Sequence, residues 1–393
     1  MRRRSTALAV LLLCAALPPL SGCSSGAAGT AVGSAPPGTP AVSGTSDASG
    51  KPGASAAPAK GSARVTATVA DGIETPWGLA PLPGGGLLVS SRDSYRVYRV
   101  DPGSRRKTVV GTVPGVVSNA AQGGEAGLLG LALSPAFRSD RLLYAYYSSA
   151  TDNRIARMTY DPTRPAGSQL GPPQVILAGI PRGVHHDGGR IAFGPDGMLY
   201  AGTGDAGRPA SAQDKSSLGG KILRMTPTGA PAPGNPFGAT VVYSYGHRNV
   251  QGLAWDPQGR LWASEFGDKQ ADELNLILPG RNYGWPATQG RTDHPGYTSP
   301  VAQWGTEEDS PSGIAYAEGS IWMAALKGER LWRIPLDGTR VAAAPQAFLT
   351  GTYGRLRSVL ADPDGTLLLT TSNTDGRAHP RPGDDRILRL TVH

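Results

Sequence analysis

A recurring pattern of apolar and turn-forming positions runs through most of the chain. Each copy has a short apolar run, then a turn rich in Gly, Pro and Asp, then a second run rich in Leu, Tyr, Trp and Ser or Thr. The six copies are anchored on one apolar position each, at Leu79, Leu131, Ile191, Leu253, Ile314 and Val359. These anchors lie 45 to 62 residues apart, a period typical of repeat architectures.

Each copy predicts two strands joined by a tight turn, as in GPDG at 194–197. The intervals between copies contain further strand-like runs, at 154–160, 221–225 and 330–335. Four strands per repeat at this period indicate a propeller blade, so the chain is predicted to be all-β, with a six-bladed β-propeller over residues 64–393. A β-sandwich of repeated hairpins is the alternative, but its strands recur at shorter intervals and without a shared pattern.

The two ends of this region suit closure of a ring. Residues 64–69 and 385–392 both read as strands. They could complete one blade between them, which would cover otherwise open sheet edges. We therefore expect a single closed domain.

The amino-acid composition supports the all-β interpretation. The chain has 55 glycines and 35 prolines among 393 residues, about 23%, against roughly 12% in average proteins. Neither residue is well tolerated inside a helix. The composition therefore excludes a helical bundle and argues against a doubly wound α/β fold.

The first 22 residues read as a lipoprotein signal peptide. Arg2 to Arg4 supply the positive charge, residues 7–17 form an apolar segment too short to span a bilayer, and Leu20-Ser21-Gly22-Cys23 resembles a bacterial lipidation motif. Cys23 would carry the lipid. An ordinary signal peptide with an incidental cysteine is the alternative. The only other cysteine lies inside the signal, so the exported domain is expected to have no disulfide.

Residues 23–63 are rich in Ser, Gly, Ala and Pro and are expected to form a flexible linker after the lipidated cysteine. The chain is thus predicted to be an exported lipoprotein at the outer face of the bacterial membrane, attached through its lipid alone. The net charge of +8 is not concentrated in any run of Lys or Arg. We therefore expect no nucleic-acid partner.

Polar residues recur at comparable points of different copies, where propeller loops would bring them to one pocket near the axis. His186 precedes the third copy, Asp205 ends it, and Arg248 lies just before the fourth. A histidine beside a carboxylate suits general-base catalysis. The cations at this level are Arg248, Lys327, Arg355 and Arg357. Because they would repel one another without an anion, they favour a polycarboxylate or phosphate ligand.

The sequence points to calcium rather than to zinc. No histidine or cysteine spacing matches a zinc site. Gly267, Asp268, Asp272 and Glu273 could offer the oxygen ligands that calcium prefers, although a solvated acidic loop is the alternative. No G-x-S-x-G motif supports nucleophilic serine catalysis.

Four segments together carry a family resemblance. They are GLLGLALSPAF from Gly127, HHDGGRIAFGPDGMLY from His185, YGHRNVQGLAWDP from Tyr245 and SEFGDKQADELNLILPGRNYGWP from Ser264. Residues 65–393 resemble the soluble PQQ-dependent sugar dehydrogenases, the glucose/sorbosone dehydrogenase family of six-bladed propellers. The resemblance implies PQQ and Ca²⁺ as cofactors, a sugar as substrate and an external electron acceptor.

The resemblance also implies roles for individual residues. His186 matches the base that takes the proton of the anomeric hydroxyl, Asp205 the carboxylate that orients it, and Arg248 the arginine above the quinone. His185 is the next candidate for the base if the loop register differs. Cofactor-contacting positions are matched by Asn249, Gln251, Lys327, Arg355 and Arg357. The carbonyls of Gly267 and Asp268 match the calcium ligands.

Three departures from the family pattern bear on the substrate. Glu125 stands where glucose-oxidising members have a sugar-contacting glutamine, Phe266 replaces a polar cofactor neighbour, and Asp268 replaces a proline. Insertions that shape the sugar pocket of those members are missing. We therefore expect a broader aldose specificity, or a substrate other than glucose.

The predicted function is oxidation of an aldose at its anomeric hydroxyl to the lactone, with hydride transfer to PQQ. Two alternatives come from other classes. One is a calcium-dependent, lactonase-like propeller hydrolase, which would retain activity without PQQ. The other is a non-catalytic glycan- or protein-binding propeller, which would not need to keep a base together with a cluster of cations.

Overall fold

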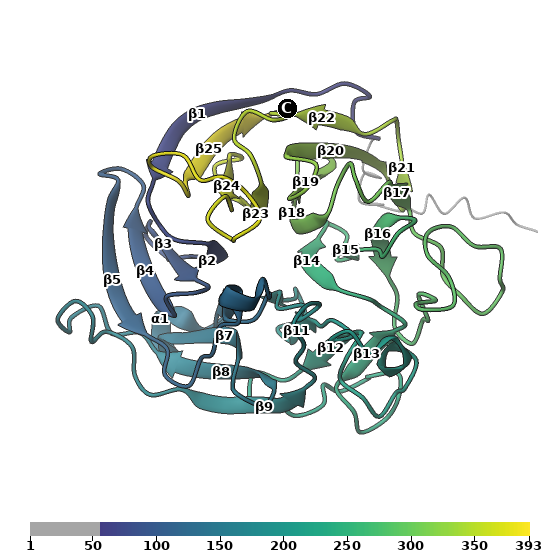
Figure 1. Cartoon of the computed structure of the whole chain (residues 1–393), viewed down its shortest axis with the longest axis horizontal. Coiled ribbons are helices and arrows are strands. Elements are labelled where there is room, and N and C mark those ends of the chain that lie inside the picture. The colour runs from purple at the N-terminus through teal and green to yellow at the C-terminus, as the bar shows by residue number, and fades with distance from the viewer. Residues whose placement is uncertain (1–55) are drawn as a thin grey trace, which may run out of the picture. The chain divides into compact units, whose positions relative to one another are not determined.

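Six antiparallel sheets surround a central axis in the computed structural model, which describes residues 56–393 (Figure 1). Five sheets have four strands and one has five. The predicted six-bladed β-propeller is confirmed, and a two-sheet sandwich is excluded. Cys23, the signal segment and residues 23–55 of the linker lie outside the described residues. No helix within 56–393 is long and apolar enough to cross a membrane.

The blades follow one another along the chain. The first contains β2 (Pro76–Pro81), β3 (Leu87–Ser91), β4 (Arg96–Asp101) and β5 (Arg106–Thr112). The second contains β6 (Leu128–Leu133), β7 (Leu142–Ser148), β8 (Asn153–Thr159) and β9 (Gln174–Ile180), with the short helix α1 (Phe137–Asp140) between β6 and β7. The third contains β10 (Ile191–Phe193), β11 (Leu199–Gly202), β12 (Lys221–Met225) and β13 (Val242–Tyr245).

The other three blades repeat this order. The fourth contains β14 (Val250–Trp255), β15 (Leu261–Glu265), β16 (Asp272–Ile277) and β17 (Ala302–Trp304). The fifth contains β18 (Pro311–Ala317), β19 (Ser320–Ala325), β20 (Arg330–Asp337), β21 (Arg340–Val341) and β22 (Gln346–Phe348). The sixth contains β23 (Leu356–Ala361), β24 (Leu367–Thr371), β25 (Ile387–Val392) and β1 (Ala63–Ala70). Two 3-10 turns, Ala120–Gln122 and Pro209–Ala212, complete the regular structure of residues 56–393.

The ring closes by pairing the two ends of the described chain. β1 is antiparallel to β25, with Ala63 opposite Val392 and Ala70 opposite Ile387. The backbone of Ser62 also exchanges two hydrogen bonds with His393, of 2.9 and 3.1 Å. The predicted strands at 64–69 and 385–392 thus complete one blade, and this pairing joins the first and last strands of the ring.

All six predicted anchor residues lie in the innermost strand of a blade, and the position before each anchor controls how closely these strands approach. Four copies have glycine there, and a Cβ at Gly130 would collide with the carbonyl oxygen of Gly189 in the next blade. The third and sixth copies have Arg190 and Ser358 instead, and the Arg190 guanidinium donates to Ser358 Oγ at 3.0 Å. These two side chains therefore meet within the central channel.

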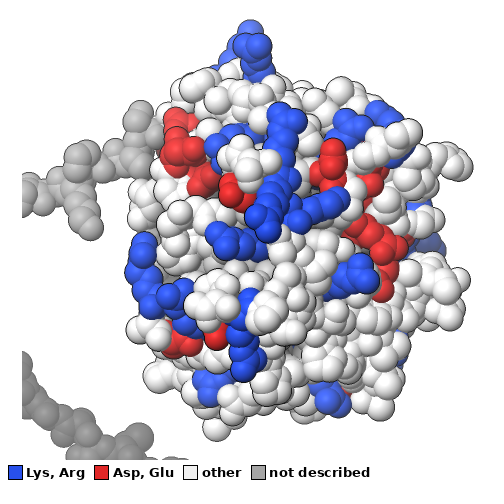
Figure 2. All heavy atoms as spheres, turned by 90° about the vertical axis from the view of Figure 1, so that its left-hand side faces the viewer, with Lys and Arg blue, Asp and Glu red and all other residues white. Residues whose placement is uncertain are grey.

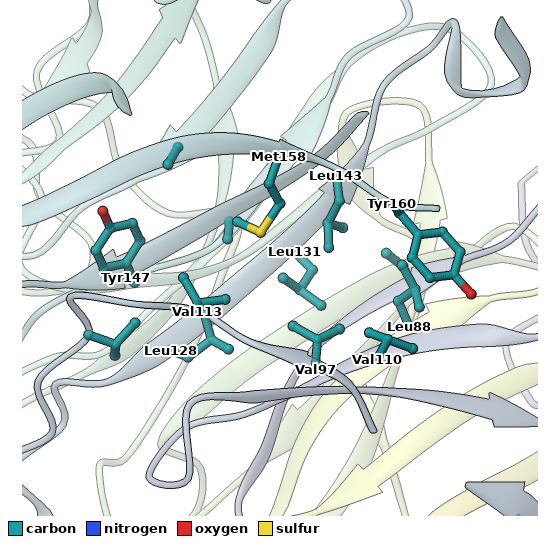
Figure 3. Close-up of a cluster of buried hydrophobic side chains, with 14 of the residues drawn as sticks. Leu88, Val97, Val110, Val113, Leu128, Leu131, Leu143, Tyr147, Met158 and Tyr160 are labelled. Carbon is teal, nitrogen blue, oxygen red and sulfur yellow. The ribbon is translucent and has the colours of Figure 1, made fainter. Parts of the chain in front are cut away.

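Apolar contacts between neighbouring blades hold the ring together. In one cluster, Leu88 and Val97 of the first blade pack with Leu131, Leu143 and Met158 of the second (Figure 3). Burying each such side chain stabilises a fold by about 1.5–3 kcal/mol. Since residues 56–393 contain no cysteine, this packing does the work that disulfides do in many small exported proteins.

The outer side of the first blades carries mixed charge. Figure 2 shows Lys and Arg side chains crossing this side of the molecule, with Asp and Glu among them. Arg99, Asp101 and Arg106 border a shallow hollow there. Positive and negative side chains are therefore interspersed on this side of the molecule, so the overall charge does not by itself locate a functional site.

Candidate active site

A polar cavity of about 490 Å³ opens at the end of the channel where the innermost strands begin. It is lined by residues from all six blades and their loops, namely Trp77, Arg92, Glu125, His185, His186, Gly188, Gln251, Phe266, Ser310, Leu326, Lys327, Arg355, Arg357 and Arg377. Eight of the residues singled out from the sequence lie in this wall: Glu125, His185, His186, Gln251, Phe266, Lys327, Arg355 and Arg357.

His186 and Asp205 form a hydrogen-bonded pair at the cavity wall. The distance from His186 Nδ1 to Asp205 Oδ1 is 2.7 Å, and the Asp205 side chain is fully buried. Trp285 Nε1 donates to Asp205 Oδ2 at 2.8 Å. Burial by itself raises the pKa of Asp205, but the hydrogen bond and charge of His186, together with donors from Gly207 and Trp285, bring that pKa below its ordinary value. Asp205 is therefore an anion that fixes the ring, which leaves His186 Nε2 to act on a ligand.

The loop that carries His186 has an unusual backbone. His186 has φ of +63°, in the left-handed region that non-glycine residues rarely adopt. Its N–H donates to Glu125 Oε2 at 3.0 Å, and its carbonyl accepts from Ala206 N at 3.1 Å. The chain passes so close to Gly204 that a Cβ there would collide with the His186 carbonyl.

Buried arginines gather on the opposite wall. Arg355 Nε and Arg357 Nη2 both donate to Asp375 Oδ2, at 2.9 and 3.2 Å. Arg92 is paired with its neighbour Asp93 at 2.9 Å and donates weakly to the Asp375 carbonyl. Burial, together with the charges of Arg92 and Arg355, lowers the pKa of Arg357 to about 10, although the Asp375 carboxylate acts to raise it. The cluster is therefore only partly neutralised by the protein.

Asp375 is the counter-ion of this cluster. Burial acts to raise its pKa, but the charges of Arg357 and Arg355 outweigh burial, so the pKa lies below its ordinary value. The set formed by Arg355, Arg357 and Lys327 therefore faces the cavity with more positive than negative charge. Such a donor set fits a ligand with several carboxylates.

Gln251 and Lys327 reach the cavity in different ways. Gln251 is buried, and its Oε1 accepts from Ser312 Oγ at 2.9 Å and from Arg357 Nη1 at 3.3 Å. Lys327 is exposed at the rim and pairs with Glu307 at 2.6 Å. Lys327 can therefore turn toward a ligand at little cost, because exposed pairs contribute little to stability.

Five of the predicted site residues do not border the cavity directly: Asp205, Arg248, Asn249, Gly267 and Asp268. Asn249 is buried behind it, where its Oδ1 accepts from Gly188 N at 2.9 Å. Arg248 stacks over Trp285 and pairs with Asp268 at 3.1 Å. Its Nε is buried without a hydrogen-bond partner among residues 56–393. Arg248 is thus close to the site but bonded to Asp268 in this structure.

The acidic segment proposed for calcium is used differently by the protein. Both Asp272 oxygens accept backbone N–H groups, from Gly267 at 2.8 Å and Ser310 at 2.7 Å. Glu273 is buried against Asn275 and accepts from Gly290 N. Within residues 56–393 no three His, Asp or Glu side chains converge as a metal site. Side chains of this segment therefore do not form a calcium cage, which leaves the carbonyls of Gly267 and Asp268.

The two other histidines near the repeat boundaries have distinct environments. His247 is fully buried between Ser244 and Glu265, at 2.8 and 2.7 Å, and stacks on Tyr283. It is therefore a structural residue. His185 is exposed at the cavity rim, 3.4 Å from Arg377, and no carboxylate of residues 56–393 orients its ring. The geometry thus favours His186 over His185 as the base.

Sequence reasoning missed Arg92, Asp375 and Arg377. Arg92 ends the first repeat copy, as Asp205 ends the third, so its position in the repeat was a usable signal. Asp375 and Arg377 lie in the loop after β24, beyond the aligned pattern. No repeat position marked them.

A larger surface hollow of about 640 Å³ lies on the face opposite the cavity, between the β2–β3 and β4–β5 turns. Its wall includes Gly84 to Gly86, Arg138 and Arg389 but no histidine. Reactive groups with ordered partners converge in the 490 Å³ cavity instead. We therefore place the candidate active site there.

Comparison with known proteins shows the family of the chain. The glucose / sorbosone dehydrogenase domain matches residues 73–387. The structure of a PQQ-bound aldose sugar dehydrogenase from Streptomyces coelicolor is 64% identical, with a TM-score of 0.84, over 86% of this chain and 100% of that one. An aldose sugar dehydrogenase of Escherichia coli is 30% identical over 78% of this chain and 89% of its own length. Quinoprotein glucose dehydrogenase B of Acinetobacter calcoaceticus is 33% identical over 62% of this chain and 56% of its own.

The matched region includes the His186–Asp205 pair, the arginine cluster, five complete blades and strands β23 and β24 of the sixth. From its repeat, its cavity and these matches, the chain belongs to the glucose/sorbosone dehydrogenase family.

Proposed function

We propose that this protein oxidises an aldose at its anomeric hydroxyl to the lactone, with PQQ as the bound hydride acceptor and an external acceptor that removes the electrons. The observation that carries the proposal is the His186–Asp205 pair facing a partly neutralised arginine cluster across one cavity. The description of the Streptomyces coelicolor relative as a PQQ-bound aldose sugar dehydrogenase supports it.

Binding of PQQ would rest on the cationic wall. Arg355, Arg357 and Lys327 would pair with its three carboxylates, while Gln251 and Asn249 offer amide groups nearby. Arg355 and Arg357 share one counter-ion, Asp375, and the positive charge left over suits such an anion. When bound, PQQ supplies the two-electron acceptor for the hydride that leaves C1 of the sugar.

The chain's own residues handle the proton. His186 Nε2 would take the proton of the anomeric hydroxyl while Nδ1 stays bonded to Asp205. The ionised Asp205 stabilises the imidazolium that results. Arg248, released from Asp268, would lie near negative charge that develops during the reaction.

We also propose that calcium assists through the carbonyls of Gly267 and Asp268. Support comes from the geometry of the segment. Its loop turns so tightly that a Cβ at Gly267 would collide with the Ala271 carbonyl. The ion would polarise a carbonyl group of the ligand as a Lewis acid. The Asp268 side chain, which pairs with Arg248, would not need to be a ligand.

Reconstitution tests the proposal. Purified apoprotein is mixed with PQQ and Ca²⁺, with PQQ alone, and with neither, and turnover is followed on an aldose panel with an artificial electron acceptor. Turnover that requires PQQ is expected, and His186→Ala should lower it by about 10²–10⁴-fold. His185→Ala is the matched control and should retain most of the activity.

The outcomes separate the alternatives. Hydrolysis of a lactone without PQQ would favour a hydrolase, and glycan binding without turnover would favour a binding module. Either result would overturn the proposal. Equal turnover with PQQ, whether or not calcium has been chelated, would overturn the calcium part alone.

We propose in addition that Cys23 is lipidated and anchors the protein at the outer face of the cell membrane. The basis is the sequence motif alone. Cys23→Ser should release the protein from the membrane fraction and abolish its labelling by radioactive fatty acid. Unchanged fractionation and labelling would refute the anchor.

A further inference from the structure

The backbone that carries the base is held by Glu125. The left-handed turn at His186 is followed by Gly188, also at φ of +63°. Glu125 Oε2 accepts the His186 N–H at 3.0 Å, while Asn249 Oδ1 accepts the Gly188 N–H at 2.9 Å. Asn249 Nδ2 also reaches Glu125 Oε2, at 3.5 Å. One carboxylate and one amide therefore hold both ends of the turn.

The loop between β5 and β6, which contains Glu125, binds the turn at other points. Glu125 N donates to the Val184 carbonyl at 2.9 Å. Asn119 Nδ2 donates to the Gly183 carbonyl at 3.2 Å and to the Val184 carbonyl at 3.4 Å. The Glu125 backbone is therefore fixed relative to the His186 loop, which keeps the Glu125 carboxylate close to the His186 N–H.

Arg377 connects this carboxylate to the arginine cluster. Its Nη2 lies 3.6 Å from Glu125 Oε1 and donates to the Gly123 carbonyl at 2.9 Å. The Arg377 N–H donates to Asp375 Oδ1 at 3.0 Å, and Asp375 is the counter-ion of Arg355 and Arg357. A continuous chain of polar contacts thus runs from the cationic wall to the base.

We propose that Glu125, aimed by Arg377, is a positioning residue that keeps His186 in its left-handed conformation and so keeps its ring on Asp205. A non-glycine residue in that conformation is strained and persists only where surrounding contacts require it. A hydrogen bond to a charged acceptor is among the strongest available to a backbone N–H. This role requires an acceptor oxygen at position 125, which the Glu125 carboxylate supplies. The expected effect of Glu125 on turnover rests on the proposed function, whereas its effect on the conformation of His186 does not.

The structural part is tested in apoprotein, without substrate or PQQ. The proton between His186 Nδ1 and Asp205 should give a strongly deshielded NMR resonance, and its loss in His186→Ala would assign it. Glu125→Ala should broaden or remove this resonance with the melting temperature still within a few degrees of wild type. Glu125→Gln keeps an acceptor oxygen and should retain the resonance.

The kinetic part uses the reconstituted enzyme. Glu125→Ala should lower kcat about 10- to 100-fold, the range that a hydrogen bond to a charged group carries, and should shift the acidic limb of the pH profile. Glu125→Gln should restore kcat to within a few-fold of wild type. Arg377→Ala should fall between the two, while Arg381→Ala, in the same loop but outside the cavity wall, is the control.

Each outcome decides the inference. A rise in KM in both Glu125 variants, with kcat and the resonance unchanged, would show that Glu125 only contacts the sugar and would overturn it. Loss of the resonance in Glu125→Gln as well as Glu125→Ala would show that charge alone matters, and would overturn the role of the hydrogen bond. If no variant or wild-type protein oxidises sugars, the proposed function fails while the NMR result still decides the positioning role.

Discussion

Replacing Asp375 with asparagine tests whether one carboxylate holds the cationic wall together. The Asp375 side chain is fully buried and lies 2.9 Å from Arg355 and 3.2 Å from Arg357. Asparagine keeps the shape of the side chain but removes its charge. Two buried guanidinium groups would then lose their shared counter-ion.

The cost can be worked from this arrangement. Removing one partner from a buried ion pair destabilises a protein by about 3–5 kcal/mol. For residues 56–393, an unfolding entropy of about 2.1 cal/mol/K per residue amounts to roughly 0.7 kcal/mol/K. The melting temperature of Asp375→Asn apoprotein should therefore fall by about 4–7 °C.

Thermal melts with and without PQQ provide the assay. An anion in the cavity would replace part of the missing negative charge, so the loss should be smaller in the presence of PQQ. Asp364→Asn, in the exposed β23–β24 turn, is the matched control and should melt close to wild type. A melting temperature for Asp375→Asn that is unchanged, or a loss that PQQ does not reduce, would refute the reasoning.

Three further predictions concern the base, a buried acid and ring closure. Asp205→Asn should keep the fold by circular dichroism but lower kcat about 10²–10⁴-fold, because a neutral amide cannot stabilise the His186 imidazolium; near-normal turnover would contradict this role. Burial raises the pKa of Asp187 from 3.8 to about 6, and its Oδ2 has no hydrogen-bond partner among residues 56–393. Since the folded pKa is the higher one, the stability from this group is present at low pH and is lost as pH rises from 3.8 to about 6, by about 3 kcal/mol. Denaturant unfolding at pH 4.5 and 7.5 should show a smaller drop in Asp187→Asn than in wild type, and parallel drops would argue against it. Deleting residues 387–393 removes β25, which leaves β1 without a partner, and should give a protein without a cooperative melt; a normal melt would show that closure by β1 is dispensable.

The sequence was enough to predict the architecture because the same strand–turn–strand pattern occurs in all six copies. Leu79, Leu131 and their four counterparts each lie in an innermost strand, and the turns between the paired strands are where the Gly, Pro and Asp positions indicated. The closing pair could be expected because residues 64–69 and 385–392 both read as strands. These are local signals that repeat six times, so errors in one copy are corrected by the others.

The site was predicted less completely because its charges are balanced by residues far apart in sequence. Nothing local showed that Asp375 would face Arg355, or that Asp268 would take the guanidinium of Arg248. The acidic pair Asp272 and Glu273 looked like metal ligands, yet their oxygens cap backbone N–H groups that the loop leaves unpaired. Which donors a carboxylate binds depends on tertiary contacts that composition and spacing do not report.

The position of the closing blade also sets the order in which the site can be assembled. β25 consists of residues 387–392, so the sixth blade cannot form before these residues have been synthesised. Pairings between residues so distant in sequence also form slowly, because a long loop must close first. Arg355, Arg357 and Asp375 all belong to this blade. A nascent chain therefore has the histidine loop long before it has the cationic wall, and loading of an anionic cofactor must follow completion of the ring.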